Sequence, residues 1–206
     1  GETAEMPDFY QSGEYDVAGF IVGVVDQKKI INGSAIREGD ICIGLPSNGL
    51  HTNGYTLARK IAFETAGLKV GQAVPELGTT IDKALMKVHR CYAPLVLPLL
   101  KKYKIAGMAH ITGGGIPGNL KRIIPDGLSA TVKTGSWPVP AIFDYLGKAG
   151  GVSDNDMFEA FNMGVGYVLV VGRESADQIM GSLSESGEKA YRIGEIRSGE
   201  QKVVLN

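Results

Sequence analysis

Gly44-Leu45-Pro46-Ser47-Asn48-Gly49-Leu50-His51-Thr52-Asn53-Gly54-Tyr55-Thr56-Leu57-Ala58-Arg59 is a polar loop between a predicted strand and a predicted helix. Its two Asn-Gly pairs are typical of tight turns, because both residues tolerate positive φ. A glycine-containing loop that leads into a helix offers free backbone N–H groups and the positive end of the helix dipole. The stretch therefore predicts an anion site, while turn geometry alone explains the same composition.

Composition limits the classes of function. Hydrophobic residues make up 44% of the 206-residue chain, which is enough for a sizeable core, and 21 basic against 22 acidic residues give a net charge of -1. A nucleic-acid-binding protein would carry a basic face. No apolar run approaches the roughly 18 residues of a membrane span, and no secretory signal opens the chain. We expect a cytoplasmic protein with neither nucleic-acid nor membrane partners.

The cysteines and glycines give two further indications. Cys42 and Cys91 do not form a CxxC spacing, so we interpret both as small buried hydrophobic residues in a reducing compartment rather than as zinc or redox ligands. Glycine occurs 29 times, about twice the average usage of ~7%. Much of it is clustered in loops, which favours sites where the backbone approaches a ligand.

The pattern of apolar residues predicts an α+β fold, with helices on one face of a largely antiparallel or mixed sheet. The connection across residues 198–200 is typical of a hairpin. A domain boundary is expected near Gly39, with the tail of one domain at 1–38 and a complete second domain at 39–206. Predicted strands span 15–25, 41–45, 105–111, 128–133, 166–171, 191–196 and 202–205. Predicted helices span 55–65, 81–92, 93–103 (broken at its prolines), a short segment ending at 124, 141–148, 154–162 and 176–184, the last two opened by capping boxes.

A second glycine-containing loop has the sequence His110-Ile111-Thr112-Gly113-Gly114-Gly115. Three consecutive glycines between a strand and a helix can point successive N–H groups into one concavity, which binds phosphate. The spacings of the Walker loop and of the dinucleotide fingerprint are both absent. A simple hinge is the alternative interpretation.

Histidine is rare in the chain, and two of the three copies stand beside these loops. His51 and His110 are therefore candidates for proton transfer, because the unperturbed pKa of histidine lies near neutrality. His89 falls within the predicted helix 81–92, and we interpret it as a structural or surface residue.

Two more stretches carry polar residues in a suggestive pattern. Glu2, Thr3 and Glu5 lie in Gly1-Glu2-Thr3-Ala4-Glu5-Met6-Pro7, where two carboxylates could hold Mg²⁺ or a substrate, or simply face solvent. This beginning also predicts a fragment of a longer protein. Phe161-Asn162-Met163-Gly164-Val165-Gly166 brings two glycines into a strand, either for a close ligand or for packing.

These four stretches, in this order, resemble the phosphoribosylformylglycinamidine cyclo-ligase (AIR synthase) family. The matching segments are GETAEMPDFY, EYDVAGFIVGVV, GLPSNGLHTNGYTLARK, HITGGGIPGNLKRIIPDG and MFEAFNMGVGYVLVV. The resemblance implies a chain that holds the end of an N-terminal ATP-binding and dimerisation domain and all of a C-terminal α+β domain. It also implies a homodimer in the full-length protein, with ATP and substrate between the domains.

The activity that the resemblance implies is ATP-dependent closure of formylglycinamidine ribonucleotide to aminoimidazole ribonucleotide in purine biosynthesis, with Mg²⁺ on the triphosphate. His51 is expected either to shuttle a proton or to stabilise the phosphorylated amide, with His110 in the same cleft. Asn48 and Asn53 orient His51, and the glycine loop holds the ribotide phosphate. The full set of expected site residues is His51, His110 and Asn53 for catalysis, Asn48, Gly49, Thr52, Thr112, Gly113, Gly114 and Gly115 for substrate, and Glu2, Thr3 and Glu5 toward ATP and Mg²⁺.

Two alternatives stay open at this point. The chain could belong to a related ATP-dependent phosphotransferase of the selenophosphate synthetase or thiamine-phosphate kinase type. It could also be a non-catalytic module that binds a ribotide, and the fragment is expected to be inactive alone.

Overall fold

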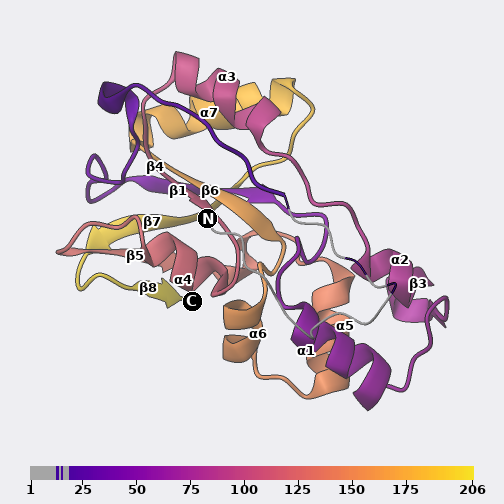
Figure 1. Cartoon of the computed structure of the whole chain (residues 1–206). Helices are drawn as coiled ribbons and strands as arrows, with labels where there is room; N and C mark the ends of the chain where they lie inside the picture. Colours follow the sequence, from indigo (N-terminus) through magenta and orange to yellow (C-terminus); the bar gives the residue numbers. More distant parts are fainter. Residues whose placement is uncertain (1–12, 14, 16–18) are drawn as a thin grey trace. The chain divides into compact units, whose positions relative to one another are not determined.

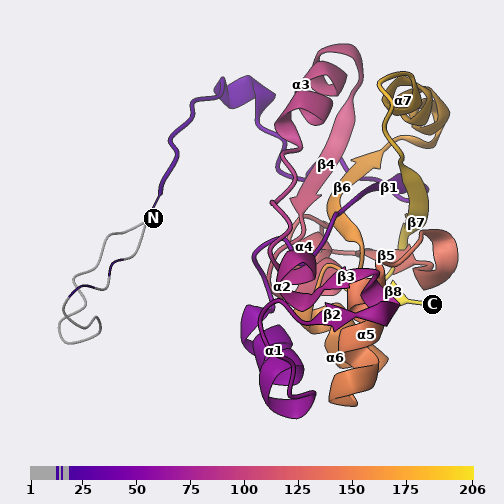
Figure 2. The same cartoon turned by 90° about the vertical axis from the view of Figure 1, so that its right-hand side faces the viewer.

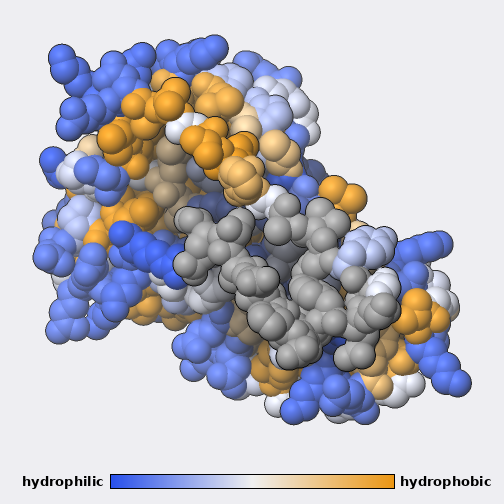
Figure 3. All heavy atoms as spheres, viewed as in Figure 1, coloured by the Kyte–Doolittle hydropathy of each residue, from blue (hydrophilic) through white to orange (hydrophobic). Residues whose placement is uncertain are grey.

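The computed structural model describes residues 13, 15 and 19–206, and the chain divides into two units, Gly1–Ile30 and Ile31–Asn206. A strand was predicted at 15–25. Of these residues the structure describes 15 and 19–25, and they have no regular secondary structure, so the prediction is wrong there. A strand is stabilised by a hydrogen-bonded neighbour, and no described strand pairs with this segment. Its apolar side chains, Phe20, Ile21 and Val22 among them, are exposed, and hydrophobic residues also reach the molecular surface in the view of Figure 3. The only regular element described in this unit is η1 (Gln27–Lys29), which Asp26 caps.

A six-stranded sheet organises the unit Ile31–Asn206, with strand order β4-β6-β1-β7-β5-β8 (Figure 1). All neighbours are antiparallel except β5 and β8, which run parallel with Ala130 opposite Val203. The hairpin predicted across residues 198–200 is therefore wrong. After β7 the chain crosses to the far side of β5, and β8 pairs with β5 and not with β7. The strands are β1 (Ile41–Pro46), β4 (Ile105–His110), β5 (Leu128–Val132), β6 (Val165–Val171), β7 (Tyr191–Ser198) and β8 (Val203–Leu205).

Helices cover both faces of this sheet, which corrects the prediction of helices on one face (Figures 1 and 2). The reason is visible in β1, where Ile41, Ile43 and Leu45 join one core cluster and Cys42 joins the other. A strand that is apolar on both faces must be covered twice. The first face carries α3 (Ala93–Lys102) and α7 (Arg173–Glu185), and the second carries α1 (Tyr55–Arg59), α4 (Gly115–Lys121), α5 (Ala141–Gly150) and α6 (Asp154–Ala160).

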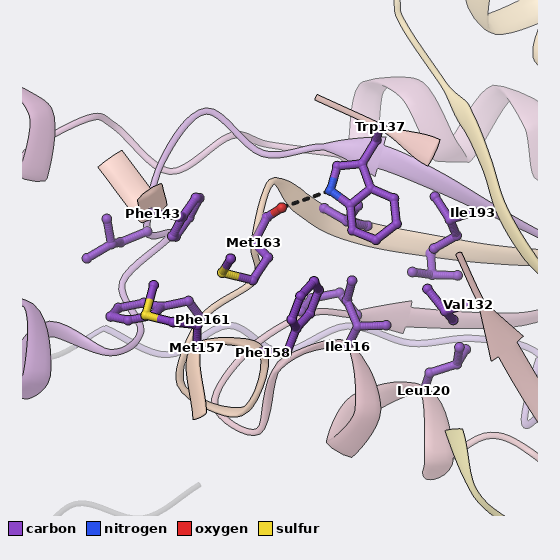
Figure 4. Close-up of a cluster of buried hydrophobic side chains, with 14 of the residues drawn as sticks. Ile116, Leu120, Val132, Trp137, Phe143, Met157, Phe158, Phe161, Met163 and Ile193 are labelled. Atoms are coloured by element: carbon purple, nitrogen blue, oxygen red, sulfur yellow. Dashed lines mark hydrogen bonds between the residues drawn. The ribbon is translucent and has the colours of Figure 1, made fainter. Parts of the chain in front are cut away.

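The core on the second face is aromatic at its centre (Figure 4). Phe143 and Phe161 are fully buried, with ring centroids 5.8 Å apart. The Trp137 indole donates a hydrogen bond of 2.8 Å to the backbone carbonyl of Met163, so its one polar atom is satisfied inside the core. This packing fixes the loop that enters β6, next to the two glycine-containing loops.

The remaining elements are short. The π-helix η2 (Lys60–Thr65) continues α1, so the predicted helix 55–65 is confirmed as one helical segment with a change of hydrogen-bond pattern. A small hairpin pairs β2 (Ala73–Val74) with β3 (Thr79–Thr80) around the 3₁₀ turn η3 (Pro75–Leu77). The helix α2 (Ile81–Leu85) and the turn η4 (Thr134–Ser136) complete the unit. No helix of the described residues is long and apolar enough to cross a membrane.

Three predicted helices differ from the structure. The helix predicted at 81–92 ends at Leu85. The Asn48 amide nitrogen donates a hydrogen bond of 2.9 Å to the Val88 carbonyl and so holds the following backbone outside the helix. The helix α3 continues through Pro98 instead of breaking, since the surrounding side chains are packed on both sides of the proline. The last helix, α7, begins at Arg173 behind Gly172, so the capping box predicted at Ser175 does not open it.

Candidate functional site

The loop between β1 and α1 has an unusual backbone. Positive φ angles occur at His51 (54°), Thr52 (63°) and Gly54 (75°). The first two are not glycines, and such a conformation is uncommon, above all for a β-branched threonine. Gly54 is required where it stands, since a Cβ there would come 2.4 Å from the Phe161 ring. The pair Asn53-Gly54 therefore makes a turn with positive φ, as predicted. At the other pair, Asn48-Gly49, Gly49 has no positive φ, and His51 has it instead.

Asn162 holds this loop from inside the protein. Its amide nitrogen donates to the carbonyls of Gly49 (2.9 Å) and Leu50 (3.2 Å), and its oxygen accepts from the Ser47 hydroxyl (2.7 Å) and the Gly164 N–H (2.9 Å). The side chain is 2% exposed. All four bonds lie within the protein, so Asn162 sets the loop conformation rather than contacting a ligand.

His51 is buried, with 1% of its surface exposed. Its Nε2 lies 2.6 Å from Asn48 Oδ1, and the backbone N–H groups of Asn48 (3.3 Å) and Arg90 (3.5 Å) donate toward the same Nε2. The Asn48 amide nitrogen donates a hydrogen bond of 2.9 Å to the Val88 carbonyl, which orients Oδ1 toward His51. The Nδ1 atom has no hydrogen-bond partner among the described residues.

Burial lowers the pKa of His51 to about 4, and electrostatic interactions with His89, His110 and Arg90 act in the same direction. Loss of hydration disfavours a charged imidazole. His51 is therefore neutral at physiological pH.

The three histidines of the chain meet in one place, which we call the histidine cluster: His51, His89 and His110. His89 stacks on His51 with ring centroids 4.2 Å apart and an interplanar angle of 18°. Its Nε2 lies 3.2 Å from His110 Nε2. From the sequence, we interpret His89 as a structural or surface residue because it falls within a predicted helix. Since α2 ends before it, His89 lies instead at the centre of the histidine cluster.

A groove of about 330 Å³ opens beside the histidine cluster, between α3 and the β4 edge of the sheet. Tyr92 and Tyr167 stand at its wall, with ring centroids 5.3 Å apart, and the Tyr167 ring lies 6.0 Å from that of His110. The Tyr92 hydroxyl donates 2.9 Å to the Pro46 carbonyl, and burial raises the pKa of this phenol. The groove offers an apolar wall with His89 and His110 at one end, and the sequence pattern did not single out either tyrosine.

The glycine loop after β4 is held by hydrogen bonds from Asn119. The Asn119 amide donates to the carbonyls of Thr112 (3.2 Å), Gly113 (3.2 Å) and Gly115 (2.8 Å). A Cβ on Gly115 would come 1.7 Å from the Phe158 carbonyl oxygen, so this glycine allows close packing. Its N–H donates to the Thr112 carbonyl and is not free for a ligand.

Gly114 lines a second groove, separate from the one beside the histidine cluster. It has φ 91° and lines a groove of about 460 Å³ together with Gly118, Lys121 and Lys202. Two ammonium groups beside a turn with positive φ suit an anion, although Glu159 stands in the same wall and Lys202 pairs with Glu200.

The two predicted loops lie next to each other. The Asn53 amide donates 2.9 Å to the His51 carbonyl, and its oxygen lies 3.7 Å from the position that a Cβ on Gly113 would take. The Ile111 N–H donates to the Gly166 carbonyl and fixes the end of β4 beside β6. Glu2, Thr3 and Glu5 lie outside the described residues, and within the described part of the chain there is no group of three or more His, Cys, Asp or Glu residues that could hold a metal ion.

The described residues thus form an α+β domain with a histidine-bearing loop after β1 and a glycine loop after the edge strand β4. The family model of the AIR synthase related protein, C-terminal domain, matches residues 37–206. The chain belongs to this family.

Relatives of known name are similar to the whole chain. The phosphoribosylformylglycinamidine cyclo-ligase of Thermodesulfovibrio yellowstonii is 48% identical over 206 residues, which are 100% of this chain and 60% of that protein. The enzyme of the same name from Trichlorobacter lovleyi is 50% identical over 198 residues, or 96% of this chain and 57% of that protein. The chain thus spans about three fifths of the length of these relatives.

Solved structures share the fold at low identity. Thiamine-monophosphate kinase from Stenotrophomonas maltophilia has a TM-score of 0.62 at 14% identity and covers 88% of this chain and 54% of that chain. The E. coli hydrogenase maturation protein HypE has a TM-score of 0.53 at 19% identity, with 84% and 48% covered. These likenesses confirm the predicted α+β fold of the family.

Proposed function

We propose that this chain forms the C-terminal part of a phosphoribosylformylglycinamidine cyclo-ligase and serves the ATP-dependent closure of formylglycinamidine ribonucleotide to aminoimidazole ribonucleotide. The observation that carries the proposal is the meeting of the His51 loop and the glycine loop at Asn53 and Gly113, in a chain 48% identical to an enzyme of that name. A site built from both loops supports a ribotide, which presents a phosphate at one end and reacting nitrogen atoms at the other.

In the proposed reaction, the γ-phosphoryl group of ATP passes to the formyl amide oxygen and ADP leaves. A substrate nitrogen then attacks the activated carbon, phosphate departs, and one proton is released. His51 and His110 are the proposed proton-transfer residues, with Asn48 and Asn53 orienting His51. His110 is exposed, whereas His51 stands behind His89 and is sealed from solvent, which supports His110 as the histidine that meets the substrate.

The ribotide phosphate is proposed to lie at the glycine loop. Thr112, Gly113 and Gly114 are the residues of that loop whose N–H groups stay candidates, while the N–H of Gly115 is used within the turn. Gly49 and Thr52 would line the opposite loop. Lys121 and Lys202, beside Gly114, supply positive charge for the phosphate.

ATP and Mg²⁺ are proposed to be held mainly outside the described residues, with Glu2, Thr3 and Glu5 contributing from the 1–38 tail of an N-terminal domain. When bound, Mg²⁺ would neutralise charge on the triphosphate. The described residues offer no carboxylate cluster for it, so we assign no step of the reaction to the metal. A cytoplasmic homodimer is proposed for the full-length protein.

The experiment joins this chain to the part of the Thermodesulfovibrio yellowstonii relative that precedes the matched segment. The chimera should consume ATP and form aminoimidazole ribonucleotide, and His110→Ala should lower kcat by roughly 100-fold or more while the protein stays folded. Val70→Ala, at a side chain that is 77% exposed, is the matched control. Unchanged turnover of His110→Ala would remove that residue from the mechanism.

Two alternatives have their own outcomes in the same chimera. Phosphorylation of thiamine phosphate or selenide without ring closure would assign the chain to a related phosphotransferase. Calorimetry of the 206-residue chain alone tests the second alternative, a non-catalytic module that binds a ribotide. Ribotide binding by this chain, together with no activity in the chimera, would identify such a module.

A further inference from the structure

The contact between His89 and His110 is a hydrogen bond between two imidazoles. Their Nε2 atoms are 3.2 Å apart, and a bond at this distance needs a proton on one nitrogen and a lone pair on the other. The identity of the donor decides which way a proton can move through the pair.

Thr52 settles the direction. Its hydroxyl donates its single proton to the His51 carbonyl at 2.6 Å. Toward His89 Nδ1, which lies 3.4 Å away, Thr52 Oγ1 can therefore only accept. His89 carries its proton on Nδ1 and a lone pair on Nε2. The proton between the two rings consequently belongs to His110 Nε2, and His110 Nδ1 is left as a basic nitrogen.

The surroundings keep this pair apart from other acids and bases. His51 meets His89 face to face, and its Nε2 is engaged by Asn48, so it exchanges no hydrogen bond with His89. On the other side, Tyr92 and Tyr167 present their rings to His110. The guanidinium of Arg90, the residue after His89, is paired with Glu188. Burial and the neighbouring His89 lower the pKa of His110.

We infer that His89 and His110 form a proton-sharing pair, with His110 as donor and His89 as acceptor, and that this pair takes up the proton released by ring closure. The second half of this inference rests on the proposed function. The lone pair of the attacking substrate nitrogen forms the new C–N bond, and phosphate leaves with the electron pair of the broken C–O bond. The N–H proton of that nitrogen passes to His110 Nδ1, while the N–H bonding pair stays on nitrogen. The Nε2 proton of His110 is then shared with His89, and the single positive charge is spread over two rings.

Nuclear magnetic resonance tests the pair directly, because the chain has only three histidines. In the ¹⁵N-histidine-labelled 206-residue chain at pH 8, we expect His89 as the Nδ1–H tautomer and His110 as the Nε2–H tautomer. On acidification the first proton taken up should change the ring signals of both residues in one step, because the macroscopic steps of coupled groups belong to the pair and not to either residue. A His89 that is protonated on Nε2, or that titrates independently of His110, would overturn the pair.

Thr52 provides variants that separate tautomer control from folding. Thr52→Ser keeps the hydroxyl and should keep both tautomers, whereas Thr52→Val removes the acceptor and should release His89 into a tautomer mixture. The same mixture in both variants would contradict the role of the hydroxyl. Loss of the fold in Thr52→Val leaves the tautomers of the unsubstituted chain and of Thr52→Ser as the deciding measurement.

The catalytic half is tested in the chimera. His89→Asn should lower kcat by about 10- to 100-fold with KM changed less than about threefold, and should shift the acid limb of the pH–rate profile. An unchanged kcat and profile would remove His89 from the reaction. If the chimera closes no ring at all, the proposed function fails, while the tautomers and coupled titration still decide on the proton-sharing pair.

Discussion

A Cβ placed on Gly166 would come 2.1 Å from the Tyr92 hydroxyl oxygen. The same position lies 2.8 Å from His51 Nδ1, so the missing side chain at Gly166 is what allows both rings to lie against β6. The tyrosine is then held by its bond to the Pro46 carbonyl at the end of β1. One glycine thus fixes the distance between the sheet and the histidine cluster.

Replacement of Gly166 by alanine should therefore be costly. The methyl group overlaps two buried rings, and overpacking of this kind destabilises a protein by roughly 1–3 kcal/mol. Chemical denaturation of Gly166→Ala should show that loss. In Gly181→Ala, a Cβ in α7 meets no atom within 4 Å, and the helix should gain about 0.5–1 kcal/mol. Equal effects of the two substitutions would contradict the crowding at Gly166.

Much of the fold follows from local pattern. The strands β1, β4, β5, β6 and β7 were predicted within one to two residues, because apolar runs bounded by turn residues are informative over short distances. The pairing of β8 was not predictable, since a parallel partner is set by tertiary packing and not by its own three residues. Coverage of both sheet faces could have been anticipated from Ile41-Cys42-Ile43, which is apolar at every position.

The candidate site was only partly predictable. His51 and His110 stand beside glycine loops that the sequence displays, whereas His89 depends on where α2 ends. That end is set by the Asn48 side chain, 40 residues away, at the Val88 carbonyl. Long-range contacts of this type leave no periodic trace in the sequence. The tyrosines of the groove were missed for the same reason.

Asn162 should be a stabilising anchor of the His51 loop. Removal of its amide in Asn162→Ala leaves the carbonyls of Gly49 and Leu50 without their buried donor. Buried groups left unsatisfied cost about 1–3 kcal/mol each, so we expect a loss of roughly 2–5 kcal/mol in denaturant unfolding. Ser136→Ala removes an exposed bond to the Lys133 carbonyl and should change stability by less than about 0.5 kcal/mol. Similar losses in both variants would exclude a special role for Asn162.

Leu146 tests the core on the α5 side of the sheet. It is fully buried, and Leu146→Ala removes three carbon atoms where neighbours cannot fully collapse. Such substitutions cost about 2–5 kcal/mol. The exposed Val70 serves again as the control, with Val70→Ala expected within about 0.5 kcal/mol of the unsubstituted chain. A loss below about 1 kcal/mol at Leu146 would mean that this helix packs loosely.

The buried His51 should make stability depend on pH in one direction. Its pKa is about 4 in the folded chain and about 6.5 when unfolded. Between these values the unfolded chain binds a proton that the folded chain does not, so acid favours unfolding. The contribution of neutral His51 is fully present above about pH 6.5 and is lost as the pH falls toward 4, by roughly 3 kcal/mol in total. His110, whose pKa is also lowered, acts in the same direction.

The variant His51→Asn isolates this contribution, because asparagine tolerates the positive φ of 54° at this position. Denaturant unfolding at intervals from pH 7.5 to 4 should show a steep loss of stability for the unsubstituted chain and a shallower one for His51→Asn. The stability of the unsubstituted chain minus that of His51→Asn should therefore fall by roughly 3 kcal/mol from pH 7.5 to 4, whatever its value at neutral pH. Carboxylates with lowered pKa, such as Glu38 and Asp82, are common to both proteins and cancel in the difference. Parallel curves across this range would mean that His51 takes up its proton as readily in the folded chain as in the unfolded one, and that the imidazole is not sealed behind His89.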